Sequence, residues 1–512
     1  MFKFVKFATV KSINKRFITS MSFIPYIKDS WRAGISDENT RGVRGSFKYG
    51  FALDIHKRRD SLSANYALSN IGTSAVINDL IRFAVTARDG STYCFGYAGS
   101  VYAIAGNPAD PVVTFVYNDE NGAIKGAAEW KQSDGNNYLM WCTNTSVARA
   151  ILNGSGDTPW PAGFATQDFK TTLDAADYHP MKNAGGSLII GNNNFLATVA
   201  FDGTFNPAAV NLRPGNVVKC LEERDDYVLI GSERIDESEE GHIWSWITTA
   251  LNWVQKKKIP VKGVNALIDT ERLLLQGGVN GEIFYSDFSN TAPLNSIPTG
   301  GQCNSQVGIY NDLAIFGIYG AGDQSGIYSY GRRAMNRPFA LNQEFRLVPS
   351  VAGNTVTEIG AVWVASSAVF ASWQVAGSTT QFGVDMSSTS TRASARLEGL
   401  EFTGGQPHLK KSYRSEKVIM EPLPAGTSLN VIYKPNRQTT GGSSSAGAGW
   451  KYARLADGTS TTYSVTDSTE AEFIINENAK VFEVGVEITP SGSSTPEVVA
   501  MVGYLDDSLS EH

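Results

Sequence analysis

The feature that most constrains the fold is a pattern that occurs seven times between Tyr93 and Met386. Each copy begins with a short apolar strand, continues with a turn that contains Gly or Asn, and ends with a second apolar or aromatic strand. The copies begin at Thr92, Asn137, Ser187, Asp226, Arg272, Asp312 and Ala368. Their starts lie roughly 40 to 55 residues apart, which is the period of four-stranded propeller blades. Because one small sheet cannot bury both of its faces alone, the units must stack around a ring. The sequence therefore predicts an all-β protein with a β-propeller, and seven blades are favoured.

Composition supports this prediction and excludes several other classes. The chain has 512 residues, which suits two domains, and its 50 Gly supply the many turns that an all-β fold needs. A net charge of −6 favours neither nucleic acid nor an anionic membrane as partner. Cysteines occur singly, so we expect buried small hydrophobes rather than a zinc ribbon or a disulfide scaffold. These are Cys94, Cys142, Cys220 and Cys303. No run of 18 apolar residues is present, so no membrane span is expected.

The two ends of the chain differ from the repeats. Residues 1–22 begin with a basic stretch that lacks the continuous apolar core of a secretory signal. We treat them as a loosely attached tail, either a transit-like or membrane-surface segment or a stretch upstream of a natural start at Met21. Residues 393–512 contain short strands separated by Asp-Gly and Pro-Ser-Gly turns, which predicts an antiparallel β-sandwich or jelly roll. Within them, residues 438–450 are too rich in Gly and Ser to predict an ordered element.

Ring closure is expected to need both ends of the propeller. If the first and last blades are not joined, the ring leaves raw sheet edges. Residues 23–70 are predicted to form an extended arm, followed by a propeller over residues 71–392. We expect residues 47–55 to supply the early closing strand and residues 394–402 to supply or flank the late one. Residues 81–97 are predicted to form a hairpin around Asp89-Gly90, and residues 114–126 another around Asn121-Gly122.

Three phrases give the chain a family resemblance. Residues 41–68 read RGVRGSFKYGFALDIHKRRDSLSANYAL, residues 283–297 read IFYSDFSNTAPLNSI, and residues 422–434 read PLPAGTSLNVIYK. In this order, around propeller repeats, they resemble virion proteins of tailed bacteriophages. The resemblance implies a tail or tail-tip structural component, produced in the host cytoplasm, with other virion proteins as partners and no catalytic residues to carry over.

Residues that could carry chemistry are few. The five His show no HxH or HExxH spacing, so no metal site and no cofactor is expected. His242 is interpreted as a strand-start residue on a solvent-exposed bend. The Gly-rich residues 317–326 lack a phosphate-binding motif, and residues 117–122 lack the first carboxylate of a calcium loop. A propeller glycoside hydrolase would draw its acids from Asp225, Asp226, Asp269, Asp287 and Asp312. Since their place before central strands already explains most of these acids as bend residues, we expect no enzymatic activity.

Interface candidates fall in one region of the chain. An acidic loop contains Asp236, Glu237, Glu239 and Glu240, and a basic run contains Lys256, Lys257 and Lys258. Such groups are usually solvated, but in a homo-oligomeric ring they could pair across subunits. Of Trp244, Trp246 and Trp253, we expect one or two to pack between blades and the third to anchor an interface. A sugar-stacking platform is the alternative for that tryptophan.

Three functions are compatible with these sequence features. The first is a structural virion protein that makes protein–protein contacts in a symmetric assembly. The second is a receptor-binding module that recognises a host glycan or surface protein through propeller loops. The third is a carbohydrate-active enzyme, which the scarcity of catalytic motifs disfavours.

Overall fold

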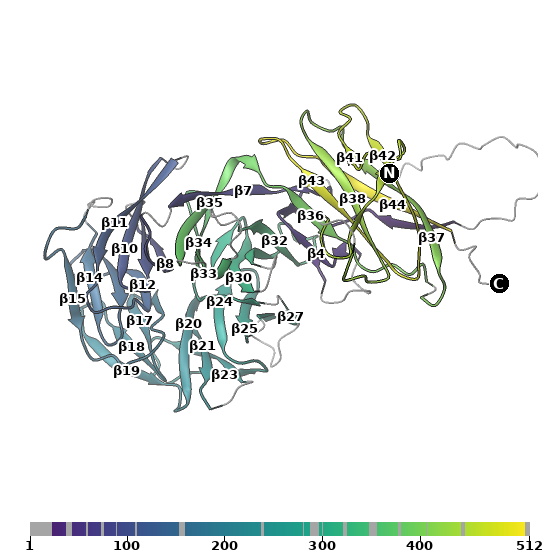
Figure 1. Cartoon of the computed structure of the whole chain (residues 1–512). Coiled ribbons are helices and arrows are strands. Elements are labelled where there is room, and N and C mark those ends of the chain that lie inside the picture. The colour runs from purple at the N-terminus through teal and green to yellow at the C-terminus, as the bar shows by residue number, and fades with distance from the viewer. Residues whose placement is uncertain are drawn as a thin grey trace, which may run out of the picture.

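The computed structural model describes residues 23–36, 44–57, 60–72, 76–88, 90–107, 110–152, 159–236, 240–279, 281–286, 296–298, 301–320, 325–347, 356–376, 380–405, 407–441 and 446–506. Every regular element within these residues is a β-strand. Figure 1 shows two bodies, a ring of sheets that contains β8 to β34 and a second body that contains β37 to β44. Over the same residues, no helix has the length and hydropathy of a membrane span.

The ring is a β-propeller, and its first five blades are sheets of four consecutive antiparallel strands. Blade 1 comprises β8 (Ile81–Thr86), β9 (Thr92–Gly96), β10 (Ser100–Asn107) and β11 (Asp110–Asn118), and blade 2 comprises β12 (Gly126–Lys131), β13 (Asn137–Cys142), β14 (Val147–Ile151) and β15 (Ala165–Lys170). Blade 3 comprises β16 (Met181–Ala184), β17 (Ser187–Asn192), β18 (Phe195–Val199) and β19 (Phe205–Asn211), and blade 4 comprises β20 (Asn216–Arg224), β21 (Tyr227–Arg234), β22 (Gly241–Ile247) and β23 (Gln255–Ile259). Blade 5 comprises β24 (Val264–Asp269), β25 (Leu273–Gly277), β26 (Glu282–Ser286) and β27 (Ser296–Pro298).

The last two blades include strands from the N-terminal part of the chain. Blade 6 comprises β28 (Gly301–Gln302), β29 (Gly308–Tyr310), β30 (Leu313–Gly320), β31 (Gly326–Gly331) and β32 (Ala340–Arg346), and its sheet continues into β2 (Gly34–Ile35) and β3 (Ser46–Phe47). Blade 7 comprises β33 (Val356–Ala365), β34 (Ala368–Val375), β35 (Gln381–Arg392) and, as its outermost strand, β7 (Tyr66–Gly72). The predicted all-β propeller is therefore confirmed, with seven blades.

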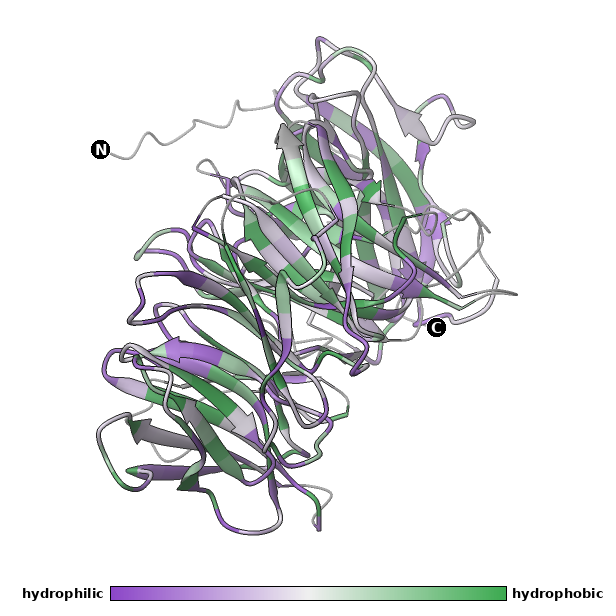
Figure 2. Cartoon of the chain, turned by 90° about the vertical axis from the view of Figure 1, so that its left-hand side faces the viewer, coloured by the Kyte–Doolittle hydropathy of each residue, from purple (hydrophilic) through white to green (hydrophobic). Residues whose placement is uncertain are grey.

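The seven sequence copies correspond to the two middle strands of the seven blades. The first copy covers β9 and β10, in which Cys94 pairs with Tyr102, and the last covers β34 and β35, in which Phe370 pairs with Met386. Middle strands read as continuous apolar runs because both of their faces are covered by neighbouring blades. In β25, for example, all five residues are buried. Figure 2 shows the same arrangement, with hydrophobic residues concentrated on strands inside the sheets.

Hydrophobic cores between neighbouring blades hold the ring together. Phe95 of blade 1 packs in one core with Trp141 of blade 2, and Ile315 of blade 6 packs with Trp373 of blade 7. Another core joins Ile81 of blade 1 to blade 7, so the ring is closed by packing as well as by strand pairing. Each large apolar side chain that is fully buried contributes about 1.5–3 kcal/mol. The stability of the propeller therefore comes from the contacts between blades.

Strand pairing closes the ring through β7, which differs from the sequence prediction. β7 runs antiparallel to β35, with Ser69 opposite Met386. Residues 47–55 were expected to supply the early strand, and that expectation was wrong. Residues 394–402 were expected to supply or flank the late strand, and they directly follow β35, which is that strand. The two segments contribute β4 (Tyr49–Phe51) and β36 (Ala395–Glu398), which pair with each other outside the propeller. The principle of closure by both chain ends holds, but the early strand lies later in the sequence than expected.

The second body consists of two antiparallel sheets that share one hydrophobic core. One sheet has the order β1 (Phe23–Lys28), β44 (Val498–Asp506), β37 (Lys411–Met420), β42 (Glu470–Ala479) and β40 (Arg454–Leu455). The other has the order β39 (Lys451–Tyr452), β38 (Ser428–Pro435), β43 (Phe482–Thr489), β36 and β4, with β41 (Thr462–Tyr463) beside β38. Val418 of the first sheet and Val486 of the second belong to the same core. The assignment of this body as a β-sandwich or jelly roll stays a prediction.

The N-terminal segment belongs to the second body and connects it to blade 6. Trp31, Phe47 and Leu53 are buried in the core of the second body, together with Ala340 of β32. A short sheet of β5 (Leu53–Asp54) and β6 (Ser63–Ala64) follows. The Asn342 side chain of blade 6 donates a buried hydrogen bond of 2.7 Å to the Leu53 carbonyl. The described part of residues 23–64 is therefore packed into the molecule, and is not only an extended arm.

One predicted hairpin is confirmed, whereas another turn and one loop differ from the predictions. The hairpin of β8 and β9 is confirmed, although Asp89 of its turn lies outside the described residues. Asn121 and Gly122 do form a turn, with a φ of 89° at Gly122, but the turn joins blade 1 to blade 2 and is not a hairpin. The described end of the Gly/Ser-rich residues 438–450 is packed, because Ala446 and Trp450 are buried against Ile432.

Candidate functional site at the channel mouth

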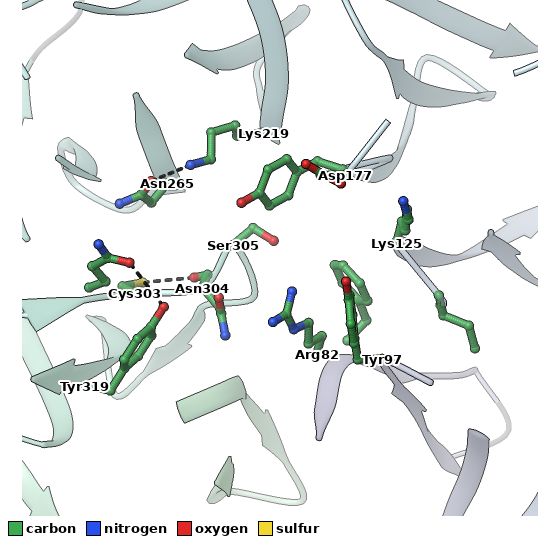
Figure 3. Close-up of a pocket in the computed structure, with 14 residues that line it drawn as sticks. Arg82, Tyr97, Lys125, Asp177, Lys219, Asn265, Cys303, Asn304, Ser305 and Tyr319 are labelled. Carbon is green, nitrogen blue, oxygen red and sulfur yellow. Dashed lines mark hydrogen bonds between the residues drawn. The ribbon is translucent and has the colours of Figure 1, made fainter. Parts of the chain in front are cut away.

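The first strands of the blades surround the axis of the propeller, and a cavity lies where these strands begin. It has a volume of about 60 Å³ and is lined by residues from blades 1 to 6. Arg82 lies on β8, Lys219 on β20 and Asn265 on β24, whereas Lys125 lies on the connection that leads into β12. Figure 3 shows these side chains around one opening. We call this cavity the channel mouth.

Three cationic side chains of the channel mouth are held by polar and aromatic neighbours. The first is Arg82, which lies 2.9 Å from Glu358 of blade 7, with its guanidinium carbon 4.2 Å from the ring centre of Tyr97. Such a stacked arginine gains from both the ion pair and the ring.

Lys219 and Lys125 are held in a similar way. Lys219 Nζ donates to Glu233, at 2.9 Å, and to Asn265, at 3.0 Å. Lys125 Nζ donates to Asn144 at 3.1 Å and also to the Ala176 carbonyl. The positive charges are therefore positioned before any ligand arrives.

The remaining groups of the channel mouth favour binding over acid–base chemistry. Burial raises the pKa of the Cys303 thiol, whose Sγ lies 2.9 Å from the Asn304 carbonyl. Burial also raises the pKa of Tyr319, an effect that the charge of Glu358 reinforces. Both groups are therefore protonated at neutral pH, when they can donate hydrogen bonds but cannot act as a thiolate or phenolate nucleophile.

A second cavity lies further along the axis, with a volume of about 310 Å³. Its wall contains Lys182 of blade 3 and Glu222 of blade 4, whose charged atoms are 3.0 Å apart. Burial raises the pKa of Glu222, and the Lys182 charge opposes this rise. The pair joins the first strands of two neighbouring blades, so part of the channel wall is made by contacts between blades.

The three predicted tryptophans all lie in blade 4. Trp244 and Trp246 are buried in the core between blades 3 and 4, as expected for one or two of them. Their indole nitrogens donate hydrogen bonds of 2.9 Å to the Ser232 hydroxyl and to the Ala250 carbonyl. Trp253 is half-buried, and its ring centre lies 4.9 Å from that of Trp244. Only Trp253 of the three therefore has appreciable surface to offer to a partner, and its interface role stays a prediction.

The acidic loop and the basic run lie beside each other at the edge of the same blade. Glu240 lies 2.6 Å from Lys258 and 2.6 Å from His242, and Asp236 pairs with Arg234. Lys256 Nζ lies 4.9 Å from the ring centre of Trp244, and Lys257 is buried. Glu237 and Glu239 lie outside the described residues. The charge pairing is thus formed within the chain, and a pairing across subunits stays a prediction.

His242 is not on an exposed bend, and that interpretation was wrong. Its side chain is fully buried on β22, with Nδ1 3.2 Å from the Asn216 side-chain oxygen. Burial, with the Lys256 charge, lowers the pKa of His242 to about 4 against the opposing effect of Glu240. The imidazole is therefore neutral at pH 7 and holds two strands of the blade together. The sequence placed this residue correctly at a strand start but could not show which residues would cover it.

The candidate acids of a hydrolase lie away from the channel mouth. Asp225, Asp226 and Asp312 lie in turns just before the second strands, and Asp225 and Asp312 have φ values of 53° and 65°. Asp269 ends β24 and lies 3.6 Å from Arg224. Asp287 lies outside the described residues. The bend interpretation of the described turn residues is confirmed by this geometry.

Sequence reasoning missed the residues of the channel mouth. Arg82, Asn265 and Gln302 are each the second residue of the first strand of a blade. A polar residue that recurs at this position is a usable signal, but it lies in the first strands, outside the repeated pattern of the middle strands. By contrast, all four cysteines are buried and free, as predicted. Across the described residues, no three His, Cys, Asp or Glu side chains are grouped so that they could hold a metal ion.

Comparison with known proteins adds little to the fold assignment. No protein-family model matches the chain, and no curated protein matches it. The WD40 β-propeller domain of Doa1 is similar over 62% of this chain and 97% of its own, with 12% identity and a TM-score of 0.43. U3-55K is similar over 63% and 99%, with 11% identity and a TM-score of 0.45. The WD40 repeats of RRP9 cover 64% and 99%, with 12% identity and a TM-score of 0.44. These likenesses concern the fold alone.

Proposed function

We propose that the protein is a non-enzymatic structural component of a bacteriophage virion, a tail or tail-tip protein that makes protein–protein contacts in a symmetric assembly. The phage assignment rests on the sequence resemblance of residues 41–68, 283–297 and 422–434. The contact role rests on an exposed apolar surface at one end of blade 4.

One end of blade 4 gathers exposed apolar side chains. In an antiparallel sheet, the turn before β21 and the turn after β22 lie at the same end. Tyr227 begins β21 and is 38% exposed, while Leu251 and Val254, after β22, are 90% and 53% exposed. Half-buried Trp253 lies between them in sequence. We call these four residues the blade 4 apolar end. Exposed aromatic and aliphatic side chains that occur together are typical of interaction surfaces.

A charge substitution at this surface tests the contact role. Leu251→Asp with Val254→Asp should leave the fold intact, because both side chains already face solvent. The double variant should fail to enter assembled particles or rings, as measured by electron microscopy and sedimentation. Val465→Asp is the matched control, since Val465 is an exposed apolar residue of the second body. Equal incorporation of the double variant and the control would contradict the contact role.

A receptor-binding module is the alternative function, and the channel mouth favours it. The positioned cations and amides of that cavity could recognise a polar group on a host glycan or surface protein. Gold labelling of particles separates the two functions. Label within the tail shaft or in a ring supports the structural role, whereas label that projects distally and blocks adsorption to host cells supports receptor binding.

A further inference from the structure

A groove in the second body has no role in the functions proposed above. It lies where the chain crosses from one sheet to the other, because β39 pairs with β38 whereas β40 pairs with β42. The groove has a volume of about 790 Å³, within the range of ligand sites, and is lined by β38, β39, β40, β42 and the turn after β40. The crossing of the chain therefore leaves a hollow of ligand size between the sheet edges.

Tyr433 provides a solvent-accessible hydroxyl in this groove. Its side chain is only 7% exposed, yet no hydrogen bond of its hydroxyl occurs among the described residues. A phenol hydroxyl that lines a groove and has no partner within the described chain is available to water or to a ligand. Burial raises the pKa of Tyr433 to about 12, so the hydroxyl is protonated and can donate.

The groove also carries one uncompensated positive charge. Lys451 lies 2.8 Å from Glu477 and is neutralised by it. Arg454 donates to the Gly458 carbonyl, at 3.2 Å, and has no acidic partner within the described chain. Its charge acts on Tyr433, since it opposes the rise of the pKa of that phenol. Arg454 and Tyr433 both line the groove, so one ligand could contact both side chains.

The remaining lining residues suit a sugar ring. Leu455 and Ile474 offer aliphatic surface, while Thr461 and Asn476 offer a hydroxyl and an amide. A pyranose ring presents C–H groups on its face and hydroxyls at its edge, so it matches apolar walls that carry a few polar groups. A phosphodiester chain would call for several convergent cations, and here there is one. An arginine fork is well suited to a single carboxylate.

We propose that this groove binds a saccharide that carries a carboxylate, such as a uronate or a sialate. Arg454 binds the carboxylate, and the Tyr433 hydroxyl donates a hydrogen bond to the sugar. The inference does not depend on the virion role, because a protein that never enters a particle could still bind such a sugar.

Titration calorimetry with three probes tests the proposal. The probes are an oligogalacturonide, sialyllactose and a neutral malto-oligosaccharide, each added to the full chain. At least one acidic probe should bind about tenfold or more tighter than the neutral one, the gain expected from a charge-assisted hydrogen bond. Affinity for the acidic probe should fall as salt is added. Failure of both acidic probes to bind, or equal affinity for the neutral probe, overturns the proposal.

Variants assign the binding to these two residues. Arg454→Gln should remove the preference for the acidic probe, and Tyr433→Phe should weaken binding of the acidic probe severalfold while it keeps the ring in place. Lys480→Gln is the matched control, because Lys480 is an exposed cation in the turn between β42 and β43. The control should bind like the unmodified chain. If Arg454→Gln and Lys480→Gln have the same effect, the carboxylate is not held by Arg454.

Discussion

The indole nitrogen of Trp373 donates a hydrogen bond of 2.9 Å to a carboxylate oxygen of Asp385, on the neighbouring strand of blade 7. The same oxygen accepts a hydrogen bond of 3.1 Å from the Asn70 amide on the closing strand β7. Asp385 is buried, so one carboxylate joins the middle of the last blade to the strand that closes the ring. The closure is thus fixed by side chains as well as by the strand ladder.

Removing this carboxylate should weaken the ring. Asp385→Ala leaves the buried indole N–H of Trp373 and the exposed amide of Asn70 without this acceptor, which should lower the free energy of unfolding by roughly 1–3 kcal/mol. Asp385→Asn is the matched control, because its amide oxygen can still accept these hydrogen bonds. Its free energy of unfolding should fall clearly less. Urea unfolding followed by tryptophan fluorescence measures both. Equal losses in the two variants would show that the acceptor does not matter.

The packing of the closing strand gives a second prediction. Ile71 of β7 packs against the core between blades 7 and 1, whereas Ser69 on the same strand is exposed. Ile71→Asp should lower the free energy of unfolding by roughly 2–3 kcal/mol, because it places a carboxylate against apolar neighbours. Ser69→Asp should be nearly neutral. Thermal unfolding and limited proteolysis between β7 and β8 would report the difference, and similar behaviour of the two variants would contradict closure by β7.

A buried carboxyl in the second body predicts a pH dependence of stability. Glu416 is fully buried, accepts a hydrogen bond from the Tyr413 hydroxyl, and has its pKa raised by burial to about 8 from an ordinary 4.5. The folded state therefore binds this proton more tightly than the unfolded state does. The contribution of this group to the free energy of unfolding is fully present below about pH 4.5 and should be lost as the pH rises through about 8, by a few kcal/mol.

Glu416→Gln should remove that decline, because the amide does not titrate. Burial also raises the pKa of Asp385, to about 6. Asp385→Asn should therefore reduce the pH dependence of the free energy of unfolding only below about pH 6. Denaturant unfolding at a series of pH values separates the two groups. A curve for Glu416→Gln that still falls between pH 6 and 8 would assign the titration to another residue.

A close approach of two backbones at the junction of blades 2 and 3 gives the fourth prediction. A Cβ atom on Gly126 would lie 1.8 Å from the His179 carbonyl oxygen, which cannot move without shifting the chain between the blades. Gly126→Ala should therefore lower the free energy of unfolding by about 2 kcal/mol or more. Gly308→Ala is the control, because a Cβ there meets side chains at ordinary contact distances of 3.4 Å and beyond. Comparable unfolding midpoints for the two variants would contradict the prediction.

The blades could be predicted because their signal is local. Each middle strand pair, such as β25 and β26, is a hairpin whose apolar run and turn lie within about 15 residues of sequence. One or two of Trp244, Trp246 and Trp253 were expected between blades, and Trp244 and Trp246 lie there. The closing strand could not be found in this way. Tyr66 and Leu68 carry no local mark that distinguishes β7 from β4, and their partner lies far along the chain on β35.

The candidate sites, like the closing strand, depend on residues that are distant in the sequence. The channel mouth brings Arg82, Lys125 and Lys219 together from three blades, and the second-body groove brings Tyr433 to Arg454 by a chain that crosses between two sheets. For His242, the polar residues beside it in the sequence suggested an exposed bend. The structure instead buries its side chain within blade 4. Burial of this kind depends on which faces meet, and not on the residues next in sequence.

The sequence by itself determined the repeating hairpins, the all-β class and the number of blades, because these depend on short-range alternation of apolar and turn residues. Only the tertiary structure decided which strand closes the ring, that the N-terminal segment enters the core of the second body, and which polar groups line the channel and the groove. Those outcomes depend on pairings between distant segments, whose free energy arises only when the complete ring and both sheets are in place.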